Sequence, residues 1–259
     1  MKITILGCGS SYGVPVIGCK CITCTSKNPK NNRTRSSILI EKNGKNFLVD
    51  TSPDFRFQAL REDLTDISAV FFTHAHADHV MGIDDLKTFA FNKKEPITTY
   101  ADKQTAESLY SNFTYIFDSR FDVAGESVSI AKMEIFEDKK IFYHEELKIY
   151  SFKQEHGLNF SMGFIFDDMV AYSTDFSAID ESEINNMASK KLKLWIADAA
   201  TIEPIKVHSN LENTLRLIEI VQPQMAIITH MSHRINYEEI SKNLPKNVFL
   251  AYDGQKISI

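Results

Sequence analysis

Three histidines and one aspartate lie within a run of six residues, directly behind an apolar segment. The segment is Val70-Phe71-Phe72-Thr73, and the run is His74-Ala75-His76-Ala77-Asp78-His79. A short apolar segment of this kind is typical of a buried strand. On such a strand the first two histidines would point to one side, and a turn into a helix would redirect the aspartate and the third histidine. The sequence therefore predicts that four polar side chains converge where a strand ends.

This set of polar groups is costly to bury unless something compensates for the lost hydration. A single histidine is more often a core residue that a hydrogen bond satisfies, but here three imidazoles and a carboxylate lie together. Imidazole nitrogen and carboxylate oxygen are ligands that suit zinc, manganese and iron. We therefore expect a metal centre at this point of the chain.

Composition and charge exclude several other classes of protein. The chain has 259 residues, of which 43% are hydrophobic, with 10 glycines and 7 prolines; disordered and collagen-like proteins are therefore excluded. The formal net charge of −5 gives no basic surplus for nucleic acid or an anionic membrane. No apolar run approaches the ~20 residues of a membrane span, and Met1–Gly9 lacks the features of a signal peptide. We expect a cytoplasmic protein with neither a membrane nor a nucleic acid as partner.

Short apolar segments bounded by turn residues predict many strands and fewer helices. The predicted strands are Ile3–Leu6, Ser37–Glu41, Asn46–Val49, Ala69–Thr73, Leu147–Phe152, Met162–Phe166, Met169–Ser173, Leu192–Ala197, Met225–Thr229 and Val248–Ala251. The predicted helices are Phe55–Arg61, His79–Phe91, Lys103–Phe113, Glu181–Ser189, Asn210–Val221 and Tyr237–Asn243. Strands and helices alternate too irregularly for a purely parallel sheet. We therefore expect an α/β (α+β) fold, a four-layer αββα sandwich of two mixed β-sheets flanked by helices.

The domain organisation follows from the absence of repeats and of proline- or serine-rich linkers in the sequence. We expect a single domain over residues 1–259. The stretch at about 87–130 is rich in aromatic residues, and we expect it to be an excursion packed on the main body. Asp102 and Asn210 are suitable N-caps for the helices that follow them, and Ser209 competes with Asn210 for that role.

The run His-x-His-x-Asp-His behind an apolar strand resembles the signature of the metallo-β-lactamase fold hydrolases. That family has a later histidine, then an aspartate where a strand ends, and then a final histidine. His156, Asp175 and His230 match these positions, and each follows a segment that is predicted to be a strand. The resemblance implies the fold of that family and two divalent ions, which are zinc or manganese, with iron also possible.

The resemblance also implies how the ligands divide between the two ions. One ion would be held by His74, His76 and His156, and the other by Asp78, His79 and His230, with Asp175 bridging them. Asp50 matches the family's early aspartate, which orients a ligand histidine. Two ions about 3.5–4 Å apart lower the pKa of a shared water, and the resulting hydroxide is the nucleophile.

Further motifs resemble one subgroup, the phosphoribosyl 1,2-cyclic phosphate phosphodiesterases. They include the opening Gly7–Pro15, the cysteine-rich Gly18–Cys24 and the segment Thr229–His233. The similarity extends from near residue 3 to near residue 254. In that subgroup a cysteine cluster and a histidine beyond the last active-site ligand form a structural zinc site. The matching residues here are Cys19, Cys21, Cys24 and His233.

Three thiolates and one imidazole form a closed tetrahedral set that suits zinc. This site would clip the N-terminal loop to the loop that carries His230. Free thiols or a redox pair are the alternative interpretations of the cysteine cluster. Cys8 stands apart from it, and we expect a small buried residue there.

Two residues are assigned catalytic roles by the resemblance. His208 matches the histidine that protonates the leaving oxygen, and Asp78 would orient the nucleophile. A solvent-facing or capping histidine is the alternative for His208. Asp198 ends a predicted strand and could support a ligand, whereas His144 has two acidic neighbours and is expected on the surface.

Three arginines are candidate phosphate contacts, because guanidinium groups match phosphate oxygens. They are Arg33, Arg35 and Arg56. Internal salt bridges are the alternative role for each of them.

The leading hypothesis is a dinuclear metallophosphodiesterase that acts on a small cyclic phosphate or a nucleotide-like phosphodiester, such as phosphoribosyl 1,2-cyclic phosphate. One alternative keeps the metals but changes the substrate to a lactone, thioester or β-lactam. The other is an accessory protein without turnover, which resembles the pyrroloquinoline quinone synthesis protein. By analogy with the family, a homodimer is possible.

Overall fold

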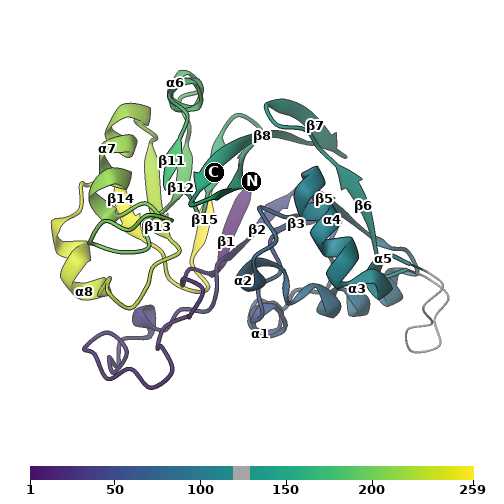
Figure 1. Cartoon of the computed structure of the whole chain (residues 1–259), viewed down its shortest axis with the longest axis horizontal. Helices are drawn as coiled ribbons and strands as arrows, with labels where there is room; N and C mark the ends of the chain where they lie inside the picture. The colour runs from purple at the N-terminus through teal and green to yellow at the C-terminus, as the bar shows by residue number, and fades with distance from the viewer. Residues whose placement is uncertain (119–128) are drawn as a thin grey trace.

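Two β-sheets face each other across a shared core in the computed structural model, which describes residues 1–118 and 129–259 (Figure 1). Phe71 of the first sheet lies with its ring centroid 5.8 Å from that of Phe166 and 6.1 Å from that of Phe164, both in the second sheet. Ala69 and Phe71 face this core, whereas Val70 faces the core on the other side of its sheet. This alternation is the period of two that makes the segment a strand with two buried faces.

The first sheet has the strand order β15-β1-β2-β3-β4-β5-β6. Its strands are β1 (Lys2–Gly7), β2 (Ser37–Lys42), β3 (Lys45–Val49), β4 (Ala69–Phe71), β5 (Ile97–Ala101), β6 (Ala131–Ile135) and β15 (Lys256–Ser258). The strands from β15 to β3 pair antiparallel, and those from β3 to β6 pair parallel. The sheet is therefore mixed.

The second sheet has the strand order β11-β8-β9-β10-β12-β13-β14, and β7 pairs with β8. Its strands are β7 (Lys140–His144), β8 (Leu147–His156), β9 (Asn159–Phe166), β10 (Val170–Ser173), β11 (Ala178–Ile179), β12 (Leu194–Asp198), β13 (Met225–Thr229) and β14 (Val248–Leu250). From β10 to β14 the pairing is parallel. The carboxyl ends of these strands therefore lie along one edge.

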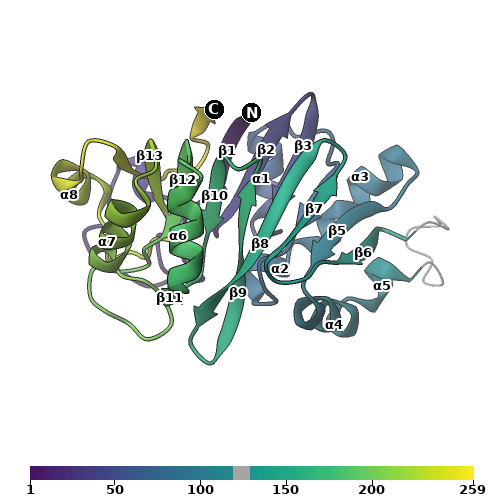
Figure 2. The same cartoon turned by 90° about the horizontal axis from the view of Figure 1, so that it is seen from above.

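Helices cover the outer faces of both sheets (Figure 2). Those on the first sheet are α1 (Phe55–Arg61), α2 (Ala77–Val80), α3 (Leu86–Lys93), α4 (Lys103–Asn112) and α5 (Thr114–Phe117). Those on the second are α6 (Glu181–Ser189) and α7 (Leu211–Val221), and α8 (Tyr237–Ile240) follows β13. The expected four-layer αββα sandwich of two mixed sheets is confirmed. Within the described residues, no helix has the length and apolar composition to cross a bilayer.

The helix that we predicted over His79–Phe91 is divided into α2, a 3-10 turn (Ile83–Asp85) and α3. A Cβ atom on Gly82 would lie 2.1 Å from the carbonyl oxygen of Ser52. The Gly82 N–H donates to the Thr51 carbonyl, and the Thr51 N–H donates to the His79 carbonyl. This contact between two backbones holds the segment in place and interrupts the helix.

The aromatic-rich stretch at about 87–130 differs from the expected excursion. It contains β5, which lies between β4 and β6 in the first sheet, so this part is built into the sheet and is not packed on it. Residues 119–128 of the stretch lie outside the described residues. Both predicted N-caps are confirmed: Asp102 accepts from the N–H groups of Gln104 and Thr105, and Asn210 accepts from that of Asn213.

Two residues on α7 offer a matched test of how the helix is held. Leu217 is buried against the second sheet, whereas the side chain of Ile220 is 45% exposed. We expect Leu217→Ala to lower the free energy of unfolding by about 2–5 kcal/mol, because it leaves a cavity. Ile220→Ala should change it by less than about 1 kcal/mol. Urea denaturation measures both values, and equal losses would contradict this packing.

Candidate metal centres

The ends of strands from both sheets bring the candidate ligands together. His74 and His76 follow β4, His156 ends β8, Asp175 follows β10 and His230 follows β13. Asp78 and His79 lie on α2, which begins one residue after His76. The structure thus gathers residues that are spread over more than 150 positions of the chain.

Three of the residues that follow strands have left-handed backbone conformations. The φ angles are +62° at Asp50, +53° at Asp175 and +56° at His230. This conformation is costly for most side chains, and aspartate and histidine are among those that adopt it more readily. A left-handed residue turns the chain sharply, and here each one lies directly in or beside the cluster.

The first group consists of His74, His76 and His156. The Nδ1 atom of His76 lies 2.9 Å from Nε2 of His74 and 3.2 Å from Nε2 of His156. The Nδ1–H of His156 donates to the Val207 carbonyl at 2.7 Å. That hydrogen bond leaves the lone pair of His156 on Nε2, directed toward the other two rings. The three nitrogens can hold one ion.

The second group consists of Asp78, His79, Asp175 and His230. Oδ2 of Asp175 lies 3.1 Å from Nε2 of His79 and 3.3 Å from Nε2 of His230. Its other oxygen, Oδ1, lies 3.7 Å from Nε2 of His156 in the first group. Asp175 therefore presents one oxygen to each group, which is the geometry that a bridging ligand requires.

The donor atoms fit a pair of divalent cations. Nε2 of His79 and Nε2 of His230 are buried and have no hydrogen-bond partner among the described residues. Buried nitrogens of this kind are rare unless something binds them. Their immediate neighbours are carboxylate oxygens, so the group combines imidazole and carboxylate in the proportions that zinc, manganese and iron accept.

The electrostatics of the second group also favour a cation. Burial acts to lower the pKa of His79 and His230, but the Asp175 carboxylate and other acidic neighbours have the larger, opposite effect. They raise the pKa of His230 to about 10 and that of His79 well above its usual value. Burial acts to raise the pKa of Asp78 and Asp175, but the nearby imidazoles hold both well below the usual range. Burial lowers the pKa of His74. The carboxylates thus stay ionised and attract positive charge.

Two buried aspartates lie at the Nδ1 side of ligand histidines, away from the candidate metal ions. Asp50 accepts hydrogen bonds from Nδ1–H of His79 at 2.7 Å and from the N–H and hydroxyl of Thr73, each at 2.8 Å. The Asp50 carboxylate therefore favours the His79 tautomer in which Nε2 is free to bind a metal. Asp198 lies with Oδ1 3.6 Å from Nδ1 of His230, beyond hydrogen-bond distance.

His208 lies beside the cluster, with its side chain 15% exposed. Its Nδ1 is 3.0 Å from Oδ2 of Asp198, and its ring stacks on that of His230 with centroids 4.8 Å apart. The centroid of His156 is 5.0 Å away. The structure therefore places His208 beside both groups of candidate ligands, although the sequence separates it from all of them.

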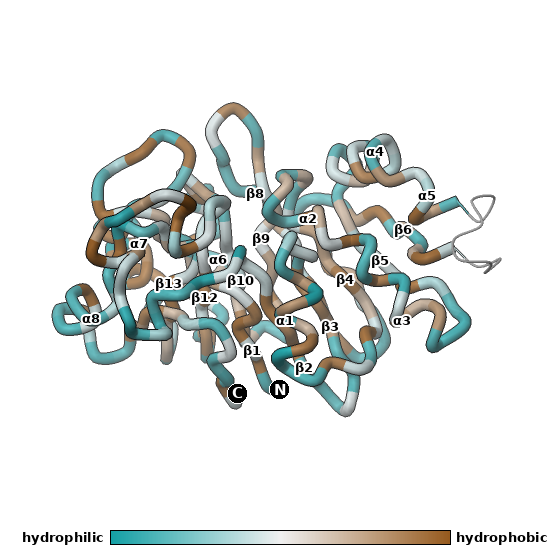
Figure 3. The backbone as a smooth tube through the Cα atoms, turned by 90° about the horizontal axis from the view of Figure 1, so that it is seen from below, coloured by the Kyte–Doolittle hydropathy of each residue, from teal (hydrophilic) through white to brown (hydrophobic). Residues whose placement is uncertain are grey.

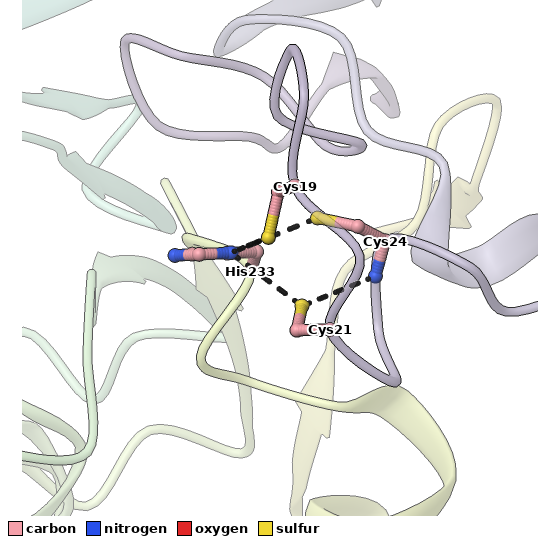
Figure 4. A group of neighbouring side chains, drawn as sticks. All are labelled: Cys19, Cys21, Cys24 and His233. Atoms are coloured by element: carbon pink, nitrogen blue, oxygen red, sulfur yellow. Dashed lines mark hydrogen bonds between the residues drawn. The ribbon is translucent and has the colours of Figure 1, made fainter.

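A second cluster contains the cysteines (Figure 4). The Sγ atoms of Cys19, Cys21 and Cys24 lie 3.2, 3.5 and 3.6 Å from Nδ1 of His233. The N–H of Cys24 donates to Cys21 and lowers the pKa of the Cys21 thiol to about 6, whereas burial raises that of Cys24 to about 11. Three sulfurs and one nitrogen around a common point fit a tetrahedral zinc ion. Cys8 lies elsewhere and is buried, as expected.

The arginines and His144 lie outside these clusters. Arg33 is buried and donates to the carbonyls of Ser232 and Ile235, and Arg35 pairs with Asp54. Arg33 and Arg35 therefore make contacts within the protein, which was the alternative to binding phosphate. Arg56 is exposed on α1. His144, which was expected on the surface, is half-buried with Nδ1 3.0 Å from the Tyr100 hydroxyl.

The sequence did not predict the hydrogen bond from His156 to the Val207 carbonyl, which fixes the His156 ring. It is a backbone group, and no side-chain pattern indicates it. Asp198 was expected only to support a ligand, from its position after a predicted strand, and its contact with His208 was not predicted.

A protein-family model matches more than half of the chain. The model of the beta-lactamase superfamily domain matches residues 45–231. An octanoyltransferase of Porphyromonas gingivalis is 31% identical over 98% of the chain and 51% of its own length. The coenzyme PQQ synthesis protein B of Methylobacterium radiotolerans is 30% identical over 54% of the chain and 48% of its own length. A ribonuclease Z of Methanococcus maripaludis is 22% identical over 70% and 53%. The chain thus spans about half the length of the curated relatives it matches.

Solved structures are similar over nearly the whole chain. A diphosphatase from the PhnP family has a TM-score of 0.90 and 34% identity, covering 99% of this chain and 96% of that one. Zn²⁺-bound PqqB from Methylobacterium extorquens has a TM-score of 0.78 and 20% identity, with both chains fully covered. The human short-form tRNase Z has a TM-score of 0.72 and 18% identity, covering 100% and 99%. The last two likenesses show a shared fold.

The cysteine cluster leads to a test of zinc content. We expect Cys21→Ser to bind one zinc ion fewer per chain than the unsubstituted protein and to unfold at a lower temperature, because metal binding stabilises the folded state. Cys8→Ala, which removes a cysteine outside the cluster, should keep the zinc content unchanged. Elemental analysis of dialysed protein measures both. Equal zinc in Cys21→Ser and the unsubstituted chain would contradict the site.

Proposed function

Because the chain belongs to the beta-lactamase superfamily of metallo-β-lactamase fold proteins, we propose that it is a dinuclear metal-dependent phosphodiesterase. Its substrate would be a small cyclic phosphate or a nucleotide-like phosphodiester, of the kind that phosphoribosyl 1,2-cyclic phosphate represents. The observation that carries the proposal is the position of Asp175, with one oxygen toward each histidine group and His208 beside both. The similarity to a PhnP-family diphosphatase, at 34% identity, supports the phosphate chemistry.

The proposed ligands are His74, His76 and His156 for one ion and Asp78, His79 and His230 for the other, with Asp175 between them. When bound, two such ions lower the pKa of a water and neutralise charge on the phosphate oxygens. His79 and His156 are held in the required tautomer by Asp50 and the Val207 carbonyl. The protein's own contribution is thus a fixed frame for the phosphate group.

Asp78 is suited to orient the attacking water. Its carboxylate stays ionised, because His79 and His230 hold its pKa well below the usual range. An ionised carboxylate accepts hydrogen bonds only, so a water beside it would direct its hydrogen toward Asp78 and its lone pair toward the phosphorus. Asp78 therefore acts on the nucleophile side of the phosphate.

His208 is suited to protonate the leaving oxygen. Its Nδ1 is occupied by Asp198, which leaves Nε2 as the atom that faces a substrate. A proton carried on Nε2 would be the one that reaches the leaving oxygen. His208 would therefore act as general acid and Asp198 as the residue that positions it.

The substrate class can be tested with purified protein to which zinc or manganese has been restored. Hydrolysis of bis(p-nitrophenyl) phosphate is expected, and His76→Ala should abolish it while leaving the zinc of the cysteine cluster bound. Lactone, thioester and precursor-tRNA substrates are assayed in parallel. If the protein holds both active-site metals but is inert to every phosphodiester, a lactone or thioester that is cleaved would replace the proposed substrate. Inertness to the whole panel would favour an accessory role.

The role of His208 can be tested by changing the leaving group. General acid catalysis of this kind contributes about 10²–10⁴-fold for a poor leaving group. We therefore expect His208→Gln to slow the release of phenol far more than the release of p-nitrophenol, which needs little protonation. His144→Gln, a histidine outside the centre, is the matched control and should behave as the unsubstituted protein. An equal loss on both esters in His208→Gln would assign His208 a structural role.

A further inference from the structure

Exposed apolar side chains lie on two loops beside the metal centre, one directly after His156 and one directly before His208. The tip of the β8–β9 hairpin carries Leu158, which is 103% exposed and lies two residues after His156. The loop before His208 carries Ile202, Ile205 and Val207, which are 42%, 40% and 42% exposed. Exposed aliphatic groups clustered at one place indicate a binding surface more often than singly exposed ones do.

The two loops are in contact with each other. A Cβ atom on Gly157, beside Leu158, would lie 2.8 Å from Cγ1 of Val207. The carbonyl of Val207 also accepts the hydrogen bond from His156 at 2.7 Å. In Figures 2 and 3 the hairpin tip and the other loop lie at the same end of the molecule, and Figure 3 shows hydrophobic residues on both. We refer to Leu158, Ile205 and Val207 as the apolar rim; Ile202 is not part of it, because it lines a cavity with Cys21 and His233 of the cysteine cluster.

The apolar rim adjoins the side of the centre where the leaving group departs. Val207 directly precedes His208, the proposed general acid, whose ring lies 5.0 Å from that of His156 between centroids. A leaving oxygen that takes a proton from His208 therefore has Val207 and the hairpin tip beside it. The 202–207 loop carries one acidic and one basic residue, Glu203 and Lys206, both exposed, so it offers no surplus of positive charge for a second phosphate.

We propose that the apolar rim binds an alkyl or aryl group on the leaving-group side of the substrate. This inference rests on the proposed phosphodiesterase activity and narrows its substrate to diesters with an apolar alcohol, in place of the phosphoribosyl group named above. A substrate with an apolar alcohol would cover side chains that otherwise face water, and that burial would favour it over a smaller or more polar ester. Leu158 and Val207 would be the main specificity residues, because Leu158 follows His156 by two residues and Val207 directly precedes His208.

The test compares two phosphodiesters whose leaving groups have similar acidity but different apolar area, methyl phenyl phosphate and methyl 4-butylphenyl phosphate. We expect kcat/KM to be about tenfold higher for the butylphenyl ester, since contacts of a few methylenes change specificity by this order. Leu158→Ser should reduce the preference toward one. Ile220→Ser, which changes an aliphatic residue on α7 that is 45% exposed, should retain the preference of the unsubstituted protein.

The outcomes separate the two proposals. Because Leu158 is fully exposed, its replacement should leave the thermal unfolding temperature unchanged, and that measurement excludes misfolding. Hydrolysis of both esters without a preference, or a preference that Leu158→Ser retains, would overturn the apolar rim while the phosphodiesterase activity stands. If neither ester is cleaved by metal-loaded protein that also fails on bis(p-nitrophenyl) phosphate, the proposed function itself is wrong. Binding of butylphosphonate, measured by calorimetry on metal-loaded protein, should weaken in Leu158→Ser and gives a readout independent of turnover.

Discussion

The mutual attraction of buried carboxylates and imidazoles around Asp175 is the interaction on which the arrangement of the centre depends. Asp175 is almost completely buried, and its two oxygens face histidines from β8, α2 and β13. A charge in such surroundings is stable only when opposite charge compensates it. The strands that meet at this edge are therefore linked through chemistry at their ends as well as through the apolar core between them. A centre of this kind needs both sheets to be in place.

The sequence predicted the structural features that depend on local side-chain patterns. It did not predict those that depend on contacts between segments far apart in the chain. The apolar strand before His74 and both N-caps follow from local patterns. The β5 strand was missed because Thr98 and Thr99 are polar residues that the sheet buries, so their hydropathy gave no signal. The break after α2 was missed because it results from the backbone contact between Gly82 and Ser52.

The candidate ligands show the same division. The run from His74 to His79 is visible in the sequence as a local cluster. His156, Asp175 and His230 each have an ordinary local context, and only the resemblance to a family singled them out. The structure adds Val207, whose contribution is a carbonyl group and which no property of its side chain reveals.

The N-terminal loop is joined to the centre through more than the cysteine cluster. His233 lies three residues after His230, and Arg33 holds the intervening segment by donating to the Ser232 carbonyl. Asn31 donates to Glu238 and accepts from the N–H of Tyr237. Hydrogen bonds thus hold this loop against the 231–238 segment alongside the cysteines, so the position of His230 is supported from two directions.

The residues that follow strands in a left-handed conformation affect how ions would exchange at the candidate centre. Asp50, Asp175 and His230 adopt an unfavourable backbone angle as part of the native fold, so this conformational cost is met when the chain folds and not when an ion enters. The candidate ligand atoms of Asp175 and His230 are thereby preset, so one divalent ion would replace another with little rearrangement of the backbone. Among ions that the same ligands accept, occupancy would then follow the supply in the surroundings of the protein more than any selection by its frame.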